Sequence, residues 1–292
     1  MFDGIRPGQL PIFFPTDLSG AGDMAFCHAL KIALCNKCEL DIVNILRKKT
    51  PRRKRRRFPR IRQTLEQWGA LDPGSSGNAL KEKLGIYARK IRLVKPTRVN
   101  AMLRFLKREP SDLIVLASEG RTGMQRFLKP SVAERLARHA KTPMLILPRH
   151  GRGFVSTRDG TVNLDRVIMA CVGAQNAQPA MDTLSQLLFS ICEKAPQLIV
   201  YHVENAGDKP TIVAPPQLVD SVERRIERGE TTEDIISLAE KHSADLIVMA
   251  SDAPEGIKTL LTGTITEQVV RQAICPVLSV PINQSRVIKI RY

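Results

Sequence analysis

Apolar and polar positions along the chain predict strands that alternate with helices. Short continuous runs of Leu, Ile and Val are typical of strands covered on both faces, as in a parallel sheet. Between them lie longer segments whose apolar residues recur at the helical period. Asp23 could cap the N-terminus of the first of these predicted helices. In the first half we expect strands over 11–19, 40–46, 86–94, 113–116 and 143–147, and helices over 23–34 and 99–106.

The second half repeats this succession. We expect strands over 166–173, 197–203, 222–228, 246–249 and 276–280, and helices over 181–192 and 233–241. Strands that alternate with helices favour a doubly wound α/β fold with a parallel sheet.

A direct repeat divides the chain. Residues 111–148 align with 244–281 without a gap, and 14 of the 38 aligned positions are identical. A long self-match at one offset indicates a duplicated domain. We therefore predict two α/β domains, over 1–150 and 160–292, each a five-stranded parallel sheet with helices on both faces.

The first copy carries a net insertion of 22 residues after its second strand, at about 47–80. Residues 47–62 hold eleven of the 45 basic residues, and without them the net charge falls from +16 to +5. Such a cluster could bind a polyanion, either nucleic acid or an anionic membrane, or it could be a solvated loop. The polyanion interpretation assigns contacts to Arg52, Arg53, Lys54, Arg55, Arg56 and Arg57.

Composition narrows the class of protein. Apolar residues make up 43% and charged residues 25%, and no apolar run reaches the roughly 18 residues of a membrane helix. With no secretory signal at the N-terminus, we expect a cytoplasmic protein whose six scattered cysteines are free thiols. Cys35 and Cys38 lack further ligands at zinc spacing, so no metal is predicted.

Catalytic patterns are absent from the sequence. The five histidines are scattered, and there is no Ser-His-Asp order, no paired carboxylates and no GxxxxGK[ST] loop. We therefore do not expect an enzyme.

Two loops carry a resemblance to a known family. Pro15-Thr16-Asp17-Leu18-Ser19 follows the first strand, and the loop after the fourth strand ends in Ser131 at the start of a helix. They resemble the P-x-D-x-S and G-x2-G-x9-G-(S/T) patterns of universal stress proteins. Over about 270 of its 292 residues, the chain is similar to a tandem universal stress protein. The resemblance implies flavodoxin-like, Rossmann-like domains of the adenine nucleotide alpha hydrolase-like type.

The resemblance also implies an ATP or AMP site in the first domain, where a glycine-rich loop and a helix N-terminus would hold the phosphates. Two of the family's three glycines are replaced, by Ala117 and by Pro130, which lacks an N–H donor. The site is therefore partly degraded, and a vestigial loop is the alternative. The implied ligand residues are Asp17 at the nucleoside, Ile45 at the adenine, and Ala117, Gly120, Arg121 and Ser131 at the phosphates.

The second domain departs from the pattern differently. Val172 occupies the position of the acid, and Glu255 would repel a phosphate. A weaker site is implied there at Val203, Ala250, Gly263 and Thr264.

In the family, the final strands pair between domains, which here would join 143–147 with 276–280 in an internal pseudo-dimer. Further association of two chains into a homodimer is compatible with that arrangement. The function implied is stress-response regulation through adenine-nucleotide binding. The alternatives are polyanion binding through residues 47–62 with a vestigial nucleotide site and, third, weak ATP hydrolysis.

Overall fold

The computed structural model describes residues 11–46, 57–94, 97–118, 136, 139–171, 177–203, 212–227, 232–251 and 265–281. These residues form two compact units. Unit 1 takes its described residues from 11–117 and 155–162, and unit 2 takes them from 118–154 and 163–281.

Unit 1 is built on four parallel strands in the order β3-β2-β1-β4. The two inner strands, β1 and β2, are buried along nearly their whole length, as their continuous apolar runs predict. Most positions of the outer strand β3 alternate between more and less exposed, as is typical of a strand with one face toward solvent. The strands are β1 (Ile12–Thr16), β2 (Glu39–Leu46), β3 (Tyr87–Val94) and β4 (Leu113–Ala117).

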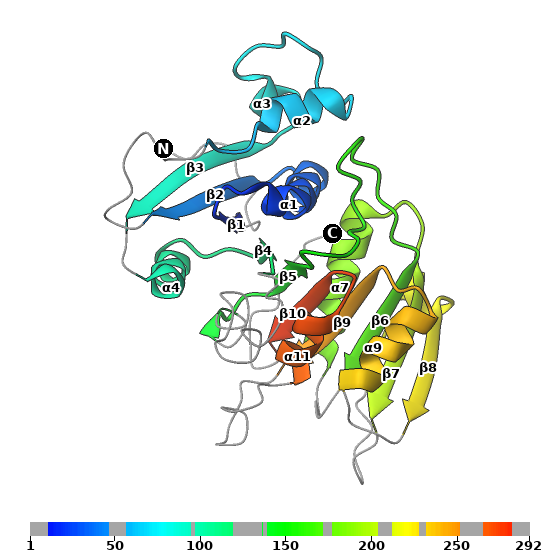
Figure 1. Cartoon of the computed structure of the whole chain (residues 1–292). Helices are drawn as coiled ribbons and strands as arrows, with labels where there is room; N and C mark the ends of the chain where they lie inside the picture. The colour runs from blue at the N-terminus through cyan, green and yellow to red at the C-terminus, as the bar shows by residue number, and fades with distance from the viewer. Residues whose placement is uncertain are drawn as a thin grey trace. The chain divides into compact units, whose positions relative to one another are not determined.

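The two main helices of unit 1 cover opposite faces of its sheet. Phe14 of β1 packs on Phe26 of α1, with ring centroids 6.0 Å apart, and Phe13 packs on Phe105 of α4 at 5.3 Å. Successive residues of a strand point to opposite faces, so α1 and α4 lie on different sides, as Figure 1 shows. The helical elements are η1 (Gly20–Gly22), α1 (Asp23–Asn36), α2 (Ile61–Gln67), α3 (Ala79–Glu82) and α4 (Arg98–Arg108).

Two details of unit 1 differ from the sequence predictions. Asp23 is the first residue of α1, and Gly22 occupies the capping position, so the predicted side-chain cap is wrong. No helix was predicted within the insertion, yet its described part contains α2 and α3. Ile61 and Leu65 of α2 are 5% and 0% exposed. One helical turn apart, they lie on the same face and anchor α2 to the core.

Unit 2 contains a sheet of six strands in the order β5-β10-β9-β6-β7-β8. Strands β5 and β10 run antiparallel, with Val277 opposite Ile146, and the other pairs are parallel. The predicted pairing of the two final strands is therefore confirmed. The strands are β5 (Met144–Leu147), β6 (Arg166–Cys171), β7 (Gln197–Val203), β8 (Val222–Glu227), β9 (Leu246–Ser251) and β10 (Val277–Pro281).

The helices of unit 2 also lie on both faces of its sheet. In Figure 1, α7 lies behind the strands, whereas α9 and α11 lie in front. The unit has the predicted α/β architecture. Its sheet has six strands with one antiparallel pair, rather than the five parallel strands predicted for each domain. Its helices are α7 (Gln178–Ile191), α8 (Pro216–Val219), α9 (Thr232–Lys241) and α11 (Ile265–Gln272).

Candidate functional site

The carboxyl edge of the unit 1 sheet brings three of the predicted nucleotide residues together. Strand β1 lies between β2 and β4, and its last residue, Thr16, pairs with Asn44 of β2. Asp17 follows directly, Ile45 is one residue beyond that pair, and Ala117 ends β4. In open α/β sheets, ligands bind outside the carboxyl ends of the strands. The predicted Gly120, Arg121 and Ser131, together with Pro130, lie outside the described residues.

Asp17 is held in a tight turn at this edge. Its Oδ1 accepts a hydrogen bond from the Ser19 N–H at 2.8 Å, while Oγ1 of Thr16 accepts one from the Leu18 N–H at 3.0 Å. Leu18 has a φ of 61°, in the left-handed region that costs an L-residue about 1–2 kcal/mol. The strained turn leaves Asp17 exposed to solvent. A carboxylate is therefore fixed where a ligand could reach it.

Asn44 completes the edge, although the sequence prediction did not include it. Its Nδ2 donates to the Thr16 carbonyl at 2.9 Å, which ties β2 to the residue preceding Asp17. The side chain is 3% exposed, and its Oδ1 has no hydrogen-bond partner among the described residues. A buried polar atom without a hydrogen-bond partner lowers the stability of the folded state. An asparagine within the apolar run LDIVNIL was the signal that could have revealed it.

The corresponding edge of unit 2 has different chemistry. Strand β6 lies between β7 and β9 and ends at Cys171, which is fully buried. Burial raises the pKa of the Cys171 thiol to about 12, so it stays neutral. Of the predicted residues, Val203 ends β7 and Ala250 is buried in β9. Val172, Glu255, Gly263 and Thr264 lie outside the described residues.

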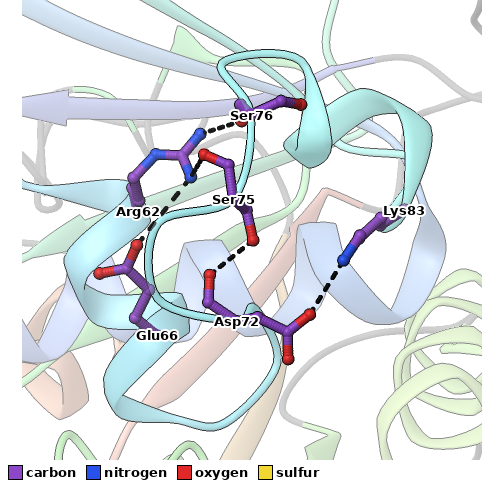
Figure 2. A network of polar contacts seen from close by, with 6 residues as sticks. All are labelled: Arg62, Glu66, Asp72, Ser75, Ser76 and Lys83. Carbon is purple, nitrogen blue, oxygen red and sulfur yellow. Dashed lines mark hydrogen bonds and ion pairs between the residues drawn. The ribbon is translucent and has the colours of Figure 1, made fainter.

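The folded part of the insertion is held by a polar network. Arg62 of α2 donates to the carbonyl oxygens of Ser75 and Ser76, at 2.9 and 2.5 Å, and also faces Glu66 at 3.9 Å (Figure 2). Asp72 and Lys83 form an exposed ion pair at 2.9 Å on the other side of the same loop. The guanidinium of Arg62 therefore holds the loop over residues 72–78 (DPGSSGN) to α2.

Phe58 of the insertion lies against the outer strand of unit 1. The Arg92 guanidinium of β3 lies 4.8 Å from the centre of the Phe58 ring, in a cation–π contact. Arg57, next to Phe58, is exposed. Of the six residues predicted to bind a polyanion, Arg57 lies in the described part of the chain, and residues 52–56 lie outside it.

A hairpin between the two repeats is also part of unit 1, with Val155 bridged to Val162. Its turn docks on the insertion, where Nε2 of Gln67 donates to the Arg158 carbonyl at 2.7 Å. Nε1 of Trp68 donates to the Thr157 carbonyl at 3.4 Å. The sequence prediction missed this contact, because nothing local links residues so far apart in the chain.

His28 of α1 holds the start of the hairpin. Its Nδ1 bonds the Met24 carbonyl at 2.8 Å, and its Nε2 accepts the Val155 N–H at 3.1 Å. Burial lowers the pKa of His28 to about 4, which keeps the ring neutral and its Nε2 free to accept. This histidine therefore has a structural role.

The described residues were also compared with the requirements of a metal site, a reactive cysteine and a membrane-spanning helix. No group of three His, Cys, Asp or Glu side chains there is arranged to hold a metal ion. All six cysteines are free, as expected, and burial raises the pKa of the Cys38 thiol to about 12. None of the described helices is long and apolar enough to span a bilayer.

Comparison with known proteins identifies the family. The model of the universal stress protein family matches residues 10–148 and 198–281, which together make up most of the chain. The chain therefore belongs to the universal stress protein family, as its loops predicted.

A universal stress protein from Methanocaldococcus jannaschii is 42% identical over 52 residues. That stretch covers 18% of this chain and 31% of the relative, so it spans about a third of the relative's length.

Solved structures agree with the fold. A universal stress protein from Archaeoglobus fulgidus DSM 4304 has a TM-score of 0.59 at 21% identity, covering 93% of this chain and 96% of its own. A protein of unknown function from Pseudomonas aeruginosa PAO1 has a TM-score of 0.57 at 14% identity, covering 94% and 92%. At these identities, the likeness supports the Rossmann-like fold alone.

Proposed function

We propose that this universal stress protein is a non-catalytic regulatory protein that binds ATP or AMP in unit 1. The observation that carries the proposal is the position of Asp17. Its carboxylate is fixed in a turn at the carboxyl edge, between the ends of β2 and β4. Family membership supports a stress-linked role in general, and this edge supports the choice of ligand.

The charge of Asp17 determines which end of the nucleotide it would bind. An ionised carboxylate accepts hydrogen bonds only, and it repels phosphate. Ribose hydroxyls are donors, so Asp17 suits the nucleoside end. One of its oxygens accepts the Ser19 N–H, which fixes the orientation of the carboxylate within the turn. The phosphates would then lie toward the end of β4, where Ala117 begins the loop that resembles the family's phosphate loop.

Asn44 acts as a positioning residue in this proposal. It holds the Thr16 carbonyl and so fixes the start of the turn that carries Asp17. Its removal would loosen the turn without removing any charge. We therefore expect a smaller loss of affinity for Asn44→Ala than for Asp17→Ala.

Calorimetric titration with ATP and with AMP tests the proposal. Asp17→Ala is expected to weaken binding about 10- to 100-fold, because hydrogen bonds to a charged group contribute about 1.5–3 kcal/mol. Asp72→Ala, which removes another exposed acid from unit 1, is the matched control and should bind like the wild type. Absence of binding to the wild type, or equal affinities for wild type and Asp17→Ala, would contradict the proposed site.

A second candidate function is polyanion binding through residues 47–62. It is favoured by the contact between Phe58 and Arg92, which ties the end of the basic run to the folded sheet. Eleven basic residues within these sixteen positions give a high local density of cations for binding phosphates. Under this alternative, the carboxyl edge of unit 1 would be a vestige of the family's nucleotide site.

A further inference from the structure

Three carboxyl groups gather around one guanidinium on the α4 side of the unit 1 sheet. Phe13, which packs on α4, pairs with Asp41, and Asp41 pairs with Arg89. Paired residues of neighbouring strands share a face, so Asp41 and Arg89 lie on the α4 side, and Glu39, two residues before Asp41, lies there too. Glu109 reaches the same guanidinium from the position that follows α4.

The N–H groups of Arg89 that face this cluster already have acceptors. Its Nε donates to Oδ1 of Asp41 at 2.6 Å, and its Nη2 donates to Oδ2 of Asp41 at 2.6 Å and to Oε2 of Glu109 at 2.5 Å. Nε carries one hydrogen and Nη2 carries two, so these bonds use all of them. Oε1 of Glu39 is in ion-pair contact with the same Nε, but it has no hydrogen-bond partner among the described residues. Glu39 therefore lies beside a positive charge that has no hydrogen left for it.

A proton on Glu39 removes this shortage. Glu39 is 3% exposed and Asp41 is 0% exposed, so bulk water is kept from both. As a carboxylic acid, Glu39 becomes a donor, and the Asp41 carboxylate lies within hydrogen-bonding reach of it. Burial, followed by the negative charge of Asp41, raises the pKa of Glu39 to about 7, which agrees with the count of hydrogens.

The other charged groups on this side of the sheet leave Arg89 as the cation of the cluster in the described part of unit 1. The hydrogen bond to Asp41 raises the pKa of Arg89 above its ordinary value, so the guanidinium stays charged. Burial and then the charge of Asp112 raise the pKa of the Cys38 thiol, next to Glu39, to about 12, which keeps it neutral. Helix α4 turns apolar residues toward the core, and its own basic residues are exposed: Arg98, Arg104, Lys107 and Arg108.

Loss of the proton would change which acid Arg89 can hold. The cluster would then carry three negative charges and one positive charge. Glu39 and Asp41 are buried, whereas the side chain of Glu109 is 44% exposed and accepts one bond from Arg89. Moving Glu109 into water therefore relieves the excess charge at the least cost. Because the Glu109 N–H bonds the Phe105 carbonyl at 2.8 Å, the last turn of α4 would loosen with it.

We propose that Glu39 and Asp41 share one proton in the folded protein, and that its release as the pH rises through neutrality detaches Glu109 from Arg89 and loosens the end of α4. The two carboxyl groups are the proton-binding site, and the last turn of α4 is the part that responds. This inference involves neither Asp17 nor the basic run, so it goes beyond both candidate functions.

Titration followed by carbon-13 NMR of the glutamate side chains tests the shared proton. The carboxyl signal that is missing from Glu39→Gln identifies Glu39. In the wild type this signal should titrate with a midpoint of about 7. A midpoint near the ordinary value of 4.5 would overturn the proposal, because Glu39 would then be ionised throughout the neutral range.

Hydrogen exchange tests the response of α4. It is measured at about pH 6 and about pH 8 on peptides covering residues 103–112, with rates corrected for the intrinsic pH dependence of exchange. In the wild type, protection of the last turn should fall about 5- to 10-fold between these pH values. Glu39→Gln keeps a donor toward Asp41 at every pH and should retain the higher protection at both. Glu109→Ala removes the contact with Arg89 and should show the lower protection at both.

The matched control is Glu82→Gln, which removes an exposed acid from α3 and should follow the wild type. Equal protection of the wild type at the two pH values would overturn the release of Glu109, even if the NMR titration showed the shared proton. A fall that persists in Glu39→Gln would assign the response to another group and would also overturn the proposal.

Folding of each variant is checked with the emission of Trp68 and with the melting temperature. Trp68 is the chain's only tryptophan, and it packs against Gly160 within unit 1. Glutamine has nearly the size and shape of glutamate, so Glu39→Gln should keep the packing around β2. If that variant nevertheless fails to fold, Glu109→Ala decides: protection equal to that of the wild type at about pH 6 would overturn the proposal.

Discussion

The carboxyl edges of the two units share a topology and differ in chemistry. In unit 1, a strained turn presents Asp17, and Asn44 braces the strand before it. In unit 2, the central strand ends in a buried, neutral thiol, Cys171. Beside the end of its central strand, unit 1 therefore has an exposed carboxylate, whereas the central strand of unit 2 ends in a buried thiol. A shared fold does not imply a shared function, because function depends on the residues of the site.

The units also differ within their second strands. In unit 1, Asp41 and Glu39 of β2 are 0% and 3% exposed, and both face Arg89 of β3. In unit 2, the residues paired at the corresponding positions are Ile199 and Glu223. Unit 1 thus buries a cluster of charges where unit 2 buries an aliphatic side chain. Buried charges respond to pH, so the two units should differ in the pH dependence of their stability.

The largest effect on the pH dependence of stability is expected from Glu39. Burial, with Asp41 close by, raises the pKa of Glu39 to about 7, from an ordinary value of 4.5. Between these two values, the folded state holds a proton that the unfolded state has released. The contribution of Glu39 to stability is therefore greatest at low pH and declines as pH rises toward and past 7, by about 2 kcal/mol.

Denaturant unfolding followed by Trp68 fluorescence measures this effect, because Trp68 belongs to unit 1. Glu39→Gln should be more stable than the wild type at about pH 8 and should lose much of the slope between about pH 5 and pH 8. A slope unchanged by Glu39→Gln would show that another group is responsible.

An effect of similar size on stability is expected in the hairpin that unit 1 holds against its insertion. Gly160 has a φ of 72°, and a Cβ added there would lie 2.5 Å from the ring of Trp68. Gly160→Ala would combine a left-handed backbone with a steric clash, so we expect a loss of about 2 kcal/mol and a red shift of the Trp68 emission.

Gly74→Ala is the matched control for that substitution. Gly74 has a φ of 77°, but nothing lies within 4 Å of its added Cβ. This variant bears the backbone cost alone, about 1 kcal/mol, and should leave the tryptophan spectrum unchanged. Equal effects of the two substitutions would mean that the hairpin does not pack on Trp68.

The smallest effects are expected within the network of Figure 2. Arg62→Ala removes two hydrogen bonds to loop carbonyls and should lower the stability of unit 1 by about 1 kcal/mol. Lys83→Ala breaks the exposed ion pair with Asp72, and no measurable change in the unfolding midpoint is expected. If Lys83→Ala lowered the stability of unit 1 more than Arg62→Ala, the ion pair rather than Arg62 would be the contact that holds the loop.

The strands could be predicted from sequence because their apolar runs record burial directly. β2 and β7, for example, are found within one residue of the predicted bounds. Helix α2 was missed because it is seven residues long and follows a basic run, so its two buried residues give too little periodic signal. The docking of the hairpin on Trp68 depends on contacts between residues some 90 positions apart, which local patterns do not encode.

The candidate site shows a similar division. Asp17 could be predicted because its motif is local, and the strand order then brings Ile45 and Ala117 to the same edge. Asn44 could not be assigned, because its role comes from its pairing with Thr16 across the sheet. An isolated polar residue in a strand has many explanations until its neighbour is known.

The number of nucleotides bound per chain tests the difference between the two units most directly. Native mass spectrometry over a range of ATP or AMP concentrations counts bound ligands without assuming where they bind. The predicted result is at most one nucleotide per chain on the wild type, and much lower occupancy on Asp17→Ala at the same concentrations. Two nucleotides per chain, or equal occupancy of wild type and Asp17→Ala, would contradict the claim that unit 1 alone retains the site.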